Sequence, residues 1–287
     1  MTIDLHTHTT ASDGSFTPSQ LVHHAKEKGL RALAVTDQDT IEGNEEALNA
    51  GVSADLEVVP GIEISVDYSP GSMHMLGYFI DTGSLRLQEK LALLQDSRAD
   101  RNPKIIEKLN SLGLAISYDE VVEASGGGQV GRPHIAQVLL QKGYTTTIQE
   151  AFDKYLGKGA PAYFDKFRLN AEDAISMITD AGGVPVLAHP FTLKCNDQGE
   201  LERLIKHLTG HGLQGLEVYY TEHNEKQISR YRLLAERNNL LLTGCSDFHG
   251  ANMAGVELGT GRGSLQIPYS LLENLKTHWK EGKDKLC

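Results

Sequence analysis

The chain has 287 residues, 40% of them hydrophobic, which is enough for one large domain or one domain with an insert. Its 38 acidic and 27 basic residues give a net charge of −11, which argues against a broad nucleic-acid-binding face. A small anionic substrate held by metal ions, or the end of a nucleic-acid strand, remains compatible with this charge. No apolar run reaches the length of a membrane span, so no membrane association is predicted.

The N-terminus and the cysteines favour a cytoplasmic protein. Functional-looking residues begin at His6, so cleavage of a signal peptide would remove part of the site and is not expected. The three cysteines, Cys195, Cys245 and Cys287, lie far apart and form no CxxC pair. We therefore expect a reducing compartment and no disulfide framework.

Short apolar runs alternate with helical segments, which predicts an α/β fold with largely parallel strands. A helix should begin at Thr17-Pro18-Ser19-Gln20, because threonine caps helices, proline suits the first turn and Gln20 completes a capping box. Gly29 should end that helix. The expected strands are residues 3–5, 30–36, 57–64, 73–80, 184–188, 216–220 and 240–244.

The alternation stops between residues 98 and 165, where short helices are expected at 103–112, 118–124, 133–142 and 148–156. Gly126-Gly127-Gly128 is expected to be a flexible joint among them. We predict a barrel domain of residues 1–97 and 166–287. Residues 98–165 should form a helical insert domain over the barrel mouth.

Nine side chains that can bind hard or borderline divalent cations lie at or just after the ends of the apolar runs. Ligands at C-terminal strand ends are typical of barrel enzymes. His74 lies near the start of its run, so that strand should be irregular or reversed. The nine are His6, His8, Asp13, Asp37, Glu63, His74, His189, Asp247 and His249.

Each of these residues also has an ordinary interpretation. Asp37 and Asp39 can cap a helix near Thr40, and Asp247-Phe248-His249 can be an Asx turn. Taken together, however, the nine predict a multinuclear metal site and a metal-dependent hydrolase. His23, His24, His207, His211 and His278 are expected on the surface, and His223 in a solvated loop.

Gly131-Arg132-Pro133-His134 lies in the insert and has two interpretations. Pro133 beside a helix start can be plain helix initiation. An insert over a metal cluster is also where phosphate-binding cations belong, and arginine presents a planar fork that fits phosphate. We favour Arg132 and His134 as substrate-binding residues.

The motifs, taken in chain order, resemble the PHP (polymerase and histidinol phosphatase) family. The similarity is greatest to the subgroup of 3′,5′-nucleoside bisphosphate phosphatases and 5′→3′ exoribonucleases. The motifs are His6-Thr7-His8-Thr9-Thr10-Ala11-Ser12-Asp13-Gly14, Thr36-Asp37-Gln38-Asp39-Thr40, Gly61-Ile62-Glu63, His74-Met75-Leu76-Gly77-Tyr78, Gly131-Arg132-Pro133-His134, Ala188-His189-Pro190 and Ser246-Asp247-Phe248-His249-Gly250.

The resemblance implies a distorted (β/α)7 barrel that holds two or three divalent ions, often Mn, Fe or Zn. It implies that His6, His8, Glu63 and Asp247 hold the first metal, that Glu63, His74 and His189 hold the second, and that Asp13, position 38 and His249 hold the third. Position 38 departs from the family pattern, because Gln38 replaces the usual histidine and an amide coordinates only weakly.

The expected function is hydrolysis of a phosphate ester by a metal-activated water. Glu63, Asp247 and His189 are the expected catalytic residues, and no protein nucleophile is needed. The expected substrate is a nucleotide, such as the bisphosphate pAp, or a short 5′-phosphorylated RNA. Two alternatives remain open: a histidinol-phosphate phosphatase, and an inactive PHP-like binding module, which Gln38 alone supports.

Overall fold

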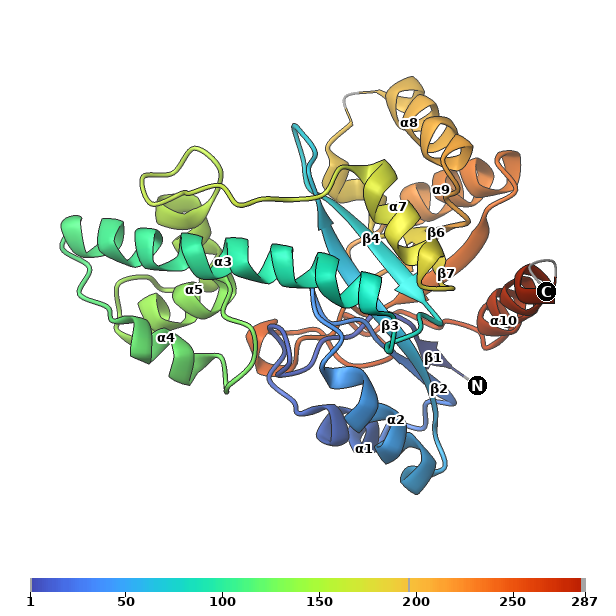
Figure 1. The fold of residues 1–287 in the computed structure, drawn as a ribbon, viewed down its shortest axis with the longest axis horizontal. Coiled ribbons are helices and arrows are strands. Elements are labelled where there is room, and N and C mark those ends of the chain that lie inside the picture. The colour runs from blue at the N-terminus through green and yellow to red at the C-terminus, as the bar shows by residue number, and fades with distance from the viewer. Residues whose placement is uncertain (1, 196, 285–287) are drawn as a thin grey trace.

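The computed structural model describes residues 2–195 and 197–284, and its seven strands form one sheet in chain order (Figure 1). Main-chain hydrogen bonds also join the segment after the first strand to the last strand and to the loop after it, from Leu5 N to Gly244 O (3.2 Å) and from His8 N to Phe248 O (3.0 Å). The predicted seven-stranded distorted barrel is thus confirmed and nearly closed. The strands are β1 (Ile3–Asp4), β2 (Ala32–Val35), β3 (Glu57–Val66), β4 (Met73–Tyr78), β5 (Val184–Leu187), β6 (Gly215–Tyr220) and β7 (Leu241–Cys245).

Strand β4 runs antiparallel to its neighbours β3 and β5, whereas all other neighbouring strands are parallel. The reversal predicted from His74 is therefore confirmed. Reversal places the start of β4 at the edge where the parallel strands end. His74 pairs with Ser65, two residues beyond Glu63, so both side chains reach the same end of the barrel.

The capping signals of the first helix are also confirmed. Helix α1 (Pro18–Glu27) begins after Thr17, whose Oγ1 accepts from Gln20 N while its own N–H donates to Gln20 Oε1. Gly29 follows the helix with a φ of 74°, a left-handed conformation that glycine adopts without strain. Helix α2 (Gly43–Ala54) packs beside α1 below the sheet in Figure 1.

Four further helices surround the sheet: α7 (Ala171–Asp180), α8 (Gln198–Gly210), α9 (Glu225–Arg237) and α10 (Ser270–Asp284). A large apolar cluster joins β3–β6 to α7, α8 and α9, and a second cluster packs α10 against β1, β2 and β5. None of the helices in the described part of the chain combines the length and apolar character needed to cross a bilayer. Cys195 and Cys245 are free thiols, and Cys287 lies outside the described residues.

The insert contains α3 (Leu85–Ser111), α4 (Tyr118–Ala124), α5 (Arg132–Gln141) and α6 (Ile148–Ala151), followed by a π-helical turn at Phe152–Leu156. Its apolar residues between Ile105 and Ala162 form a cluster of their own. The prediction that its first helix begins at residue 103 is wrong. Pro103 lies inside α3, because the apolar stripe of that helix continues on both sides of the proline and offsets the lost hydrogen bond.

The domain boundary that we predicted between residues 97 and 98 falls inside α3, which runs from beside the barrel into the insert (Figure 1). We propose that the insert is nevertheless a structural unit, supported by its separate apolar cluster. The three glycines at 126–128 form a turn, in which Gly128 packs against its neighbours, and the flexibility expected of this joint stays a prediction. A Cβ on Gly128 would lie 1.7 Å from Thr10 O, so this turn needs glycine to approach the loop that follows β1.

Candidate metal centre and cationic cavity

The predicted ligands gather at one end of the barrel, as expected for residues at or beyond strand ends. The described residues contain five groups whose potential ligating atoms lie within 4.8 Å of one another, and three of the five consist entirely of predicted ligands. These three are His6, His8 and Asp247; His6, Glu63 and His189; and His8, Asp13 and His249. His6 and His8 each belong to two groups, so the three candidate sites are contiguous.

Glu63 lies at the middle of this cluster and is buried. Its Oε1 lies 3.4 Å from His6 Nε2, 3.1 Å from His189 Nε2 and 2.7 Å from His74 Nδ1. Its Oε2 lies 3.6 Å from His8 Nε2. A carboxylate surrounded in this way can bridge two cations, which fits the role that the family resemblance implied.

Asp247 supplies an observation that points directly to a cation. Its Oδ2 accepts a hydrogen bond from Tyr220 Oη at 3.0 Å, whereas its buried Oδ1 has no hydrogen-bond partner. That Oδ1 lies 3.2 Å from His8 Nε2 and 3.5 Å from His6 Nε2. A buried carboxylate oxygen without a partner is costly, and a divalent ion bound by these three side chains would satisfy it.

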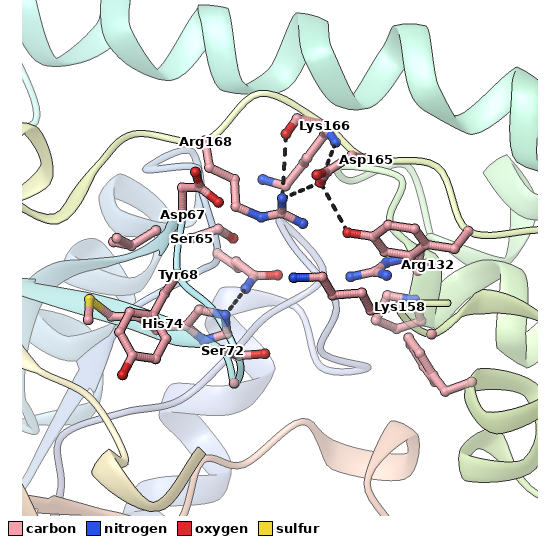
Figure 2. Close-up of a pocket in the computed structure, with 18 of the residues that line it drawn as sticks. Ser65, Asp67, Tyr68, Ser72, His74, Arg132, Lys158, Asp165, Lys166 and Arg168 are labelled. Carbon is pink, nitrogen blue, oxygen red and sulfur yellow. Dashed lines mark hydrogen bonds and ion pairs between the residues drawn. The ribbon is translucent and has the colours of Figure 1, made fainter. Parts of the chain in front are cut away.

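The third group lies at the other side of His8. The rings of His8 and His249 are stacked with centroids 4.0 Å apart, and Asp13 Oδ1 lies 3.4 Å from His249 Nε2. Gln38 was expected here by resemblance. The side-chain contact found for it among the described residues is with His74, whose Nε2 lies 3.5 Å from Gln38 Nε2 (Figure 2).

The electrostatics of the cluster also suit cations. Burial alone would lower the pKa of His249, but the carboxylates of Asp13 and Asp247 raise it to about 10. Burial would raise the pKa of Glu63 and of Asp247, yet neighbouring histidines hold both well below their usual range. The carboxylates are thus held ionised by positive charge, a charge that divalent ions would supply when bound.

Asp37 is not in the cluster, although it was one of the nine candidates. Its carboxylate accepts from Thr9 N and Oγ1, both at 2.7 Å, and from Ser12 Oγ at 2.6 Å. Gln38 forms a parallel bridge with Glu63, and side chains alternate along extended chain, so Asp37 points away from the cluster. Asp37 therefore supports the loop that carries His8 and Asp13.

A cavity of about 1080 Å³ lies between the cluster and the insert. His74, His189 and Asp247 line it from the barrel side, while the insert contributes Arg132, Phe152 and Tyr163. Seven basic side chains line its wall, and Figure 2 shows Arg132, Lys158, Lys166 and Arg168 among them, with His74. The seven are Arg98, Arg101, Arg132, Lys158, Lys166, Arg168 and Lys194.

Some of these cations are neutralised within the protein. Asp39, which is fully buried, forms ion pairs with Arg98 and with Lys166, and Asp165 pairs with Arg168. Burial, together with Arg98, lowers the pKa of Lys166 to about 7 despite the attraction of Asp39.

Arg101 and Arg132 form no ion pair with any carboxylate among the described residues. Arg101 is 3% exposed, and its guanidinium donates only to Asn102 Oδ1, at 2.8 and 3.2 Å. Burial, and then its neighbours Arg98, Arg132 and Arg168, lower the pKa of Arg101 to about 9. A buried cation without a carboxylate partner is costly, and an anion bound in the cavity would offset that cost.

Comparison with known proteins identifies the family, since the sequence profile of the PHP domain matches residues 4–253. The chain belongs to the PHP domain family. It is 33% identical over 250 residues to the 5′-3′ exoribonuclease Rnm of Salmonella typhimurium, and this match covers 86% of the chain and 84% of that protein. It is 31% identical over 260 residues to the 3′,5′-nucleoside bisphosphate phosphatase of Chromobacterium violaceum, covering 90% of each.

A solved structure from Bifidobacterium adolescentis, described as a metal-dependent phosphoesterase, superposes on this PHP chain with a TM-score of 0.85. The two sequences are 30% identical, and the match covers 95% of this chain and 94% of the other. The barrel and its helical insert are therefore shared together, because the match spans nearly the whole of both chains.

The structure separates the two insert residues that we predicted to bind substrate. Arg132 lines the cavity, where its Nη1 donates to Leu156 O at 3.0 Å and its guanidinium lies near the rings of Phe152 and Tyr163. His134 is buried and caps its own helix, accepting from Gly131 N at Nδ1 (3.0 Å). The geometry thus favours Arg132 as a substrate contact and helix initiation for His134.

Three features of this PHP site were missed from the sequence. Arg98, Arg101 and Lys166 were not singled out as cavity cations. His223 was expected in a solvated loop but is 8% exposed and packs among aromatic rings. Glu217, which belongs to none of the motifs, is fully buried, and its Oε1 lies 3.2 Å from Nδ1 of His6, a predicted ligand.

Proposed function

We propose that this PHP chain is a metal-dependent phosphoesterase that hydrolyses a phosphate ester of a nucleotide. A 3′,5′-nucleoside bisphosphate such as pAp is the preferred class of substrate, with short 5′-phosphorylated RNA as a further one. The observation that carries the proposal is that one cavity has predicted metal ligands on one side and unpaired basic side chains on the other. The metal-ligand cluster forms one wall, and the unpaired Arg101 and Arg132 belong to the other.

The residues present fit two or three divalent ions, and Mn is the first to test, with Fe and Zn as alternatives. When bound, such ions lower the pKa of a water, orient the phosphoryl group and offset its charge. Glu63, His189 and Asp247 would hold these ions beside the reacting phosphate. Arg101 and Arg132 would bind the second phosphate through charge-assisted hydrogen bonds.

The size of the cavity supports this assignment. Pockets for single small ligands measure about 300–1,000 Å³, so the cavity of about 1080 Å³ has room for a nucleotide with two phosphates. Relatives of this chain named as a nucleoside bisphosphate phosphatase and an exoribonuclease support the same substrate class. A cytoplasmic location would follow from such substrates.

The test is a panel of pAp, a 5′-phosphorylated RNA pentamer, histidinol phosphate and an aryl phosphate, each with added Mn²⁺. We expect the highest kcat/KM on pAp or on the RNA, and loss of turnover with a chelator. Preference for histidinol phosphate would overturn the nucleotide assignment. Absence of turnover with every substrate and with Mn, Fe and Zn would favour the inactive binding module.

A further inference from the structure

Glu217 on β6 is a buried carboxylate placed behind two of the metal-ligating histidines. Its Oε1 lies 3.2 Å from His6 Nδ1 and accepts from Cys245 Sγ at 2.9 Å. Its Oε2 accepts from the main-chain N of His189 at 2.8 Å. We propose that Glu217 is a positioning residue that prepares His6 and His189 for two neighbouring metal sites at once. The inference rests on the proposed metal-dependent function.

The first consequence concerns the tautomer of His6. An ionised carboxylate only accepts hydrogen bonds, so Glu217 selects the form of His6 that carries its proton on Nδ1. The lone pair is then on Nε2, which faces Glu63 Oε1 at 3.4 Å and Asp247 Oδ1 at 3.5 Å. Neutral imidazole with its lone pair toward the cluster is the form that binds a metal.

The second consequence concerns the backbone of His189. This residue has a φ of 22° and a ψ of 70°, a sparsely populated conformation that a non-glycine residue keeps only when its surroundings hold it. The charge-assisted hydrogen bond from His189 N to Glu217 supplies such a restraint. It directs the ring so that His189 Nε2 lies 3.1 Å from Glu63 Oε1.

Glutamine is the informative replacement because it has nearly the same shape but only one accepting oxygen. If the amide oxygen of Gln faces His189 N, its NH₂ group faces His6 and favours the tautomer that cannot bind a metal at Nε2. If the amide is turned over, its NH₂ group faces the His189 N–H and the two donors repel. Either orientation harms one of the two histidines, whereas a merely space-filling role would tolerate Glu217→Gln.

The experiment measures metal binding by the metal-free full-length chain, with Mn²⁺ and Co²⁺ titrated into wild type and Glu217→Gln. We expect affinity to fall roughly 10- to 100-fold at one site or both, with a changed visible spectrum of bound Co²⁺. Glu57→Gln is the matched control. Glu57 also lies in a barrel strand, but at the opposite end of β3 from Glu63, where it accepts from Tyr269 Oη at 2.6 Å.

The readout is independent of any substrate, so a failure of the proposed phosphoesterase activity leaves this test valid. Wild-type affinity and Co²⁺ spectrum in a folded Glu217→Gln protein would overturn the proposal. Equal losses in Glu57→Gln would do the same, because they would show a general effect on the barrel. If Glu217→Gln does not fold, NMR of the Zn²⁺-loaded wild type decides: a proton on Nδ1 of His6 is expected, and one on Nε2 refutes the argument.

Discussion

Arg101→Met should make the ligand-free protein more stable and the enzyme less active on a substrate with two phosphates. The change removes a buried charge that forms no ion pair within the described residues, while methionine keeps much of the aliphatic volume. Opposite signs for stability and activity are expected where a binding site holds uncompensated charge.

The stability gain can be worked from the pKa of Arg101, which burial and three neighbouring arginines lower from 12.5 to about 9. At about 1.4 kcal/mol for each pKa unit, keeping this guanidinium charged costs about 5 kcal/mol near neutral pH. Removal of the guanidinium also leaves Asn102 Oδ1 without its hydrogen-bond donor, which lowers the stability by about 1–3 kcal/mol. The net gain of about 2–4 kcal/mol should raise the unfolding midpoint by roughly 4–8 °C for a chain of this size.

The activity loss follows from the charge-assisted hydrogen bonds that Arg101 would give to the second phosphate. Such bonds are worth about 1.5–3 kcal/mol, which corresponds to a roughly 10- to 150-fold fall in kcat/KM on pAp. An aryl phosphate with a single phosphate should be hydrolysed nearly as well as by wild type. Arg262→Met is the control, because Arg262 pairs with Glu222 on the surface and should change neither property by much.

Differential scanning calorimetry of the ligand-free proteins and steady-state kinetics on both substrates decide the matter. A variant that is less stable than wild type and equally impaired on both substrates would show that Arg101 is a structural residue. Unchanged kinetics on pAp would remove Arg101 from the substrate site, and with it half of the argument for a second phosphate subsite.

Three further predictions concern the cluster and the cavity. Glu63→Ala should lose more bound metal and more turnover than His74→Ala, because Glu63 Oε1 has three histidine nitrogens within 3.4 Å; retention of the full metal content would contradict the bridging role. Gln38→His should increase metal stoichiometry or affinity, since imidazole replaces a weak amide ligand, and an unchanged titration would mean that position 38 does not reach the metals. Burial lowers the pKa of Lys166 to about 7, so KM for pAp should rise as this ammonium loses its proton above pH 7. Lys166→Arg should move that rise to higher pH, and a flat profile in wild type would show that the charge of Lys166 does not contribute to substrate binding.

The barrel could be predicted from the sequence because its signals are local. Each apolar run is a strand, and chemistry-bearing residues follow the runs, so the order of residues along the chain already indicates which edge of the sheet carries the site. The reversal of β4 was predictable for the same reason, since His74 can join the other ligands only if its strand runs backwards.

Apart from Arg132, the basic residues of the cavity wall could not be predicted, because their role depends on tertiary contacts. Arg98 and Arg101 continue the buried stripe of Leu87, Leu91 and Leu94 along α3. Such charged positions in a helix are usually solvated. Only the fold brings Asp39, 59 residues earlier in the chain, against Arg98, and leaves Arg101 without a carboxylate.

At position 38, the direction of the side chain could not be predicted from the sequence. The run from Asp37 to Asp39 offers three ligand-type side chains, and in extended chain the neighbours Asp37 and Gln38 point in opposite directions. The bridge between Gln38 and Glu63 decides the direction, and sequence spacing alone does not give that register. Thus the weakest ligand of the three contacts His74, a predicted ligand, whereas the carboxylate of Asp37 accepts hydrogen bonds from the His8 loop and that of Asp39 pairs with Arg98 and Lys166.

The charges around the cavity favour a nucleotide over histidinol phosphate. Outside the metal ligands, seven basic side chains line the wall, and the carboxylates of Asp67, Asp153 and Asp165, with Asp39 behind them, offset four of these charges. The positive charge of two divalent ions would also exceed the negative charge of the three carboxylates of Asp13, Glu63 and Asp247. A substrate with about four negative charges, such as a nucleoside bisphosphate, would neutralise this excess. Histidinol phosphate brings its own amine cation into the same space, so it lacks the charge that the buried arginines require.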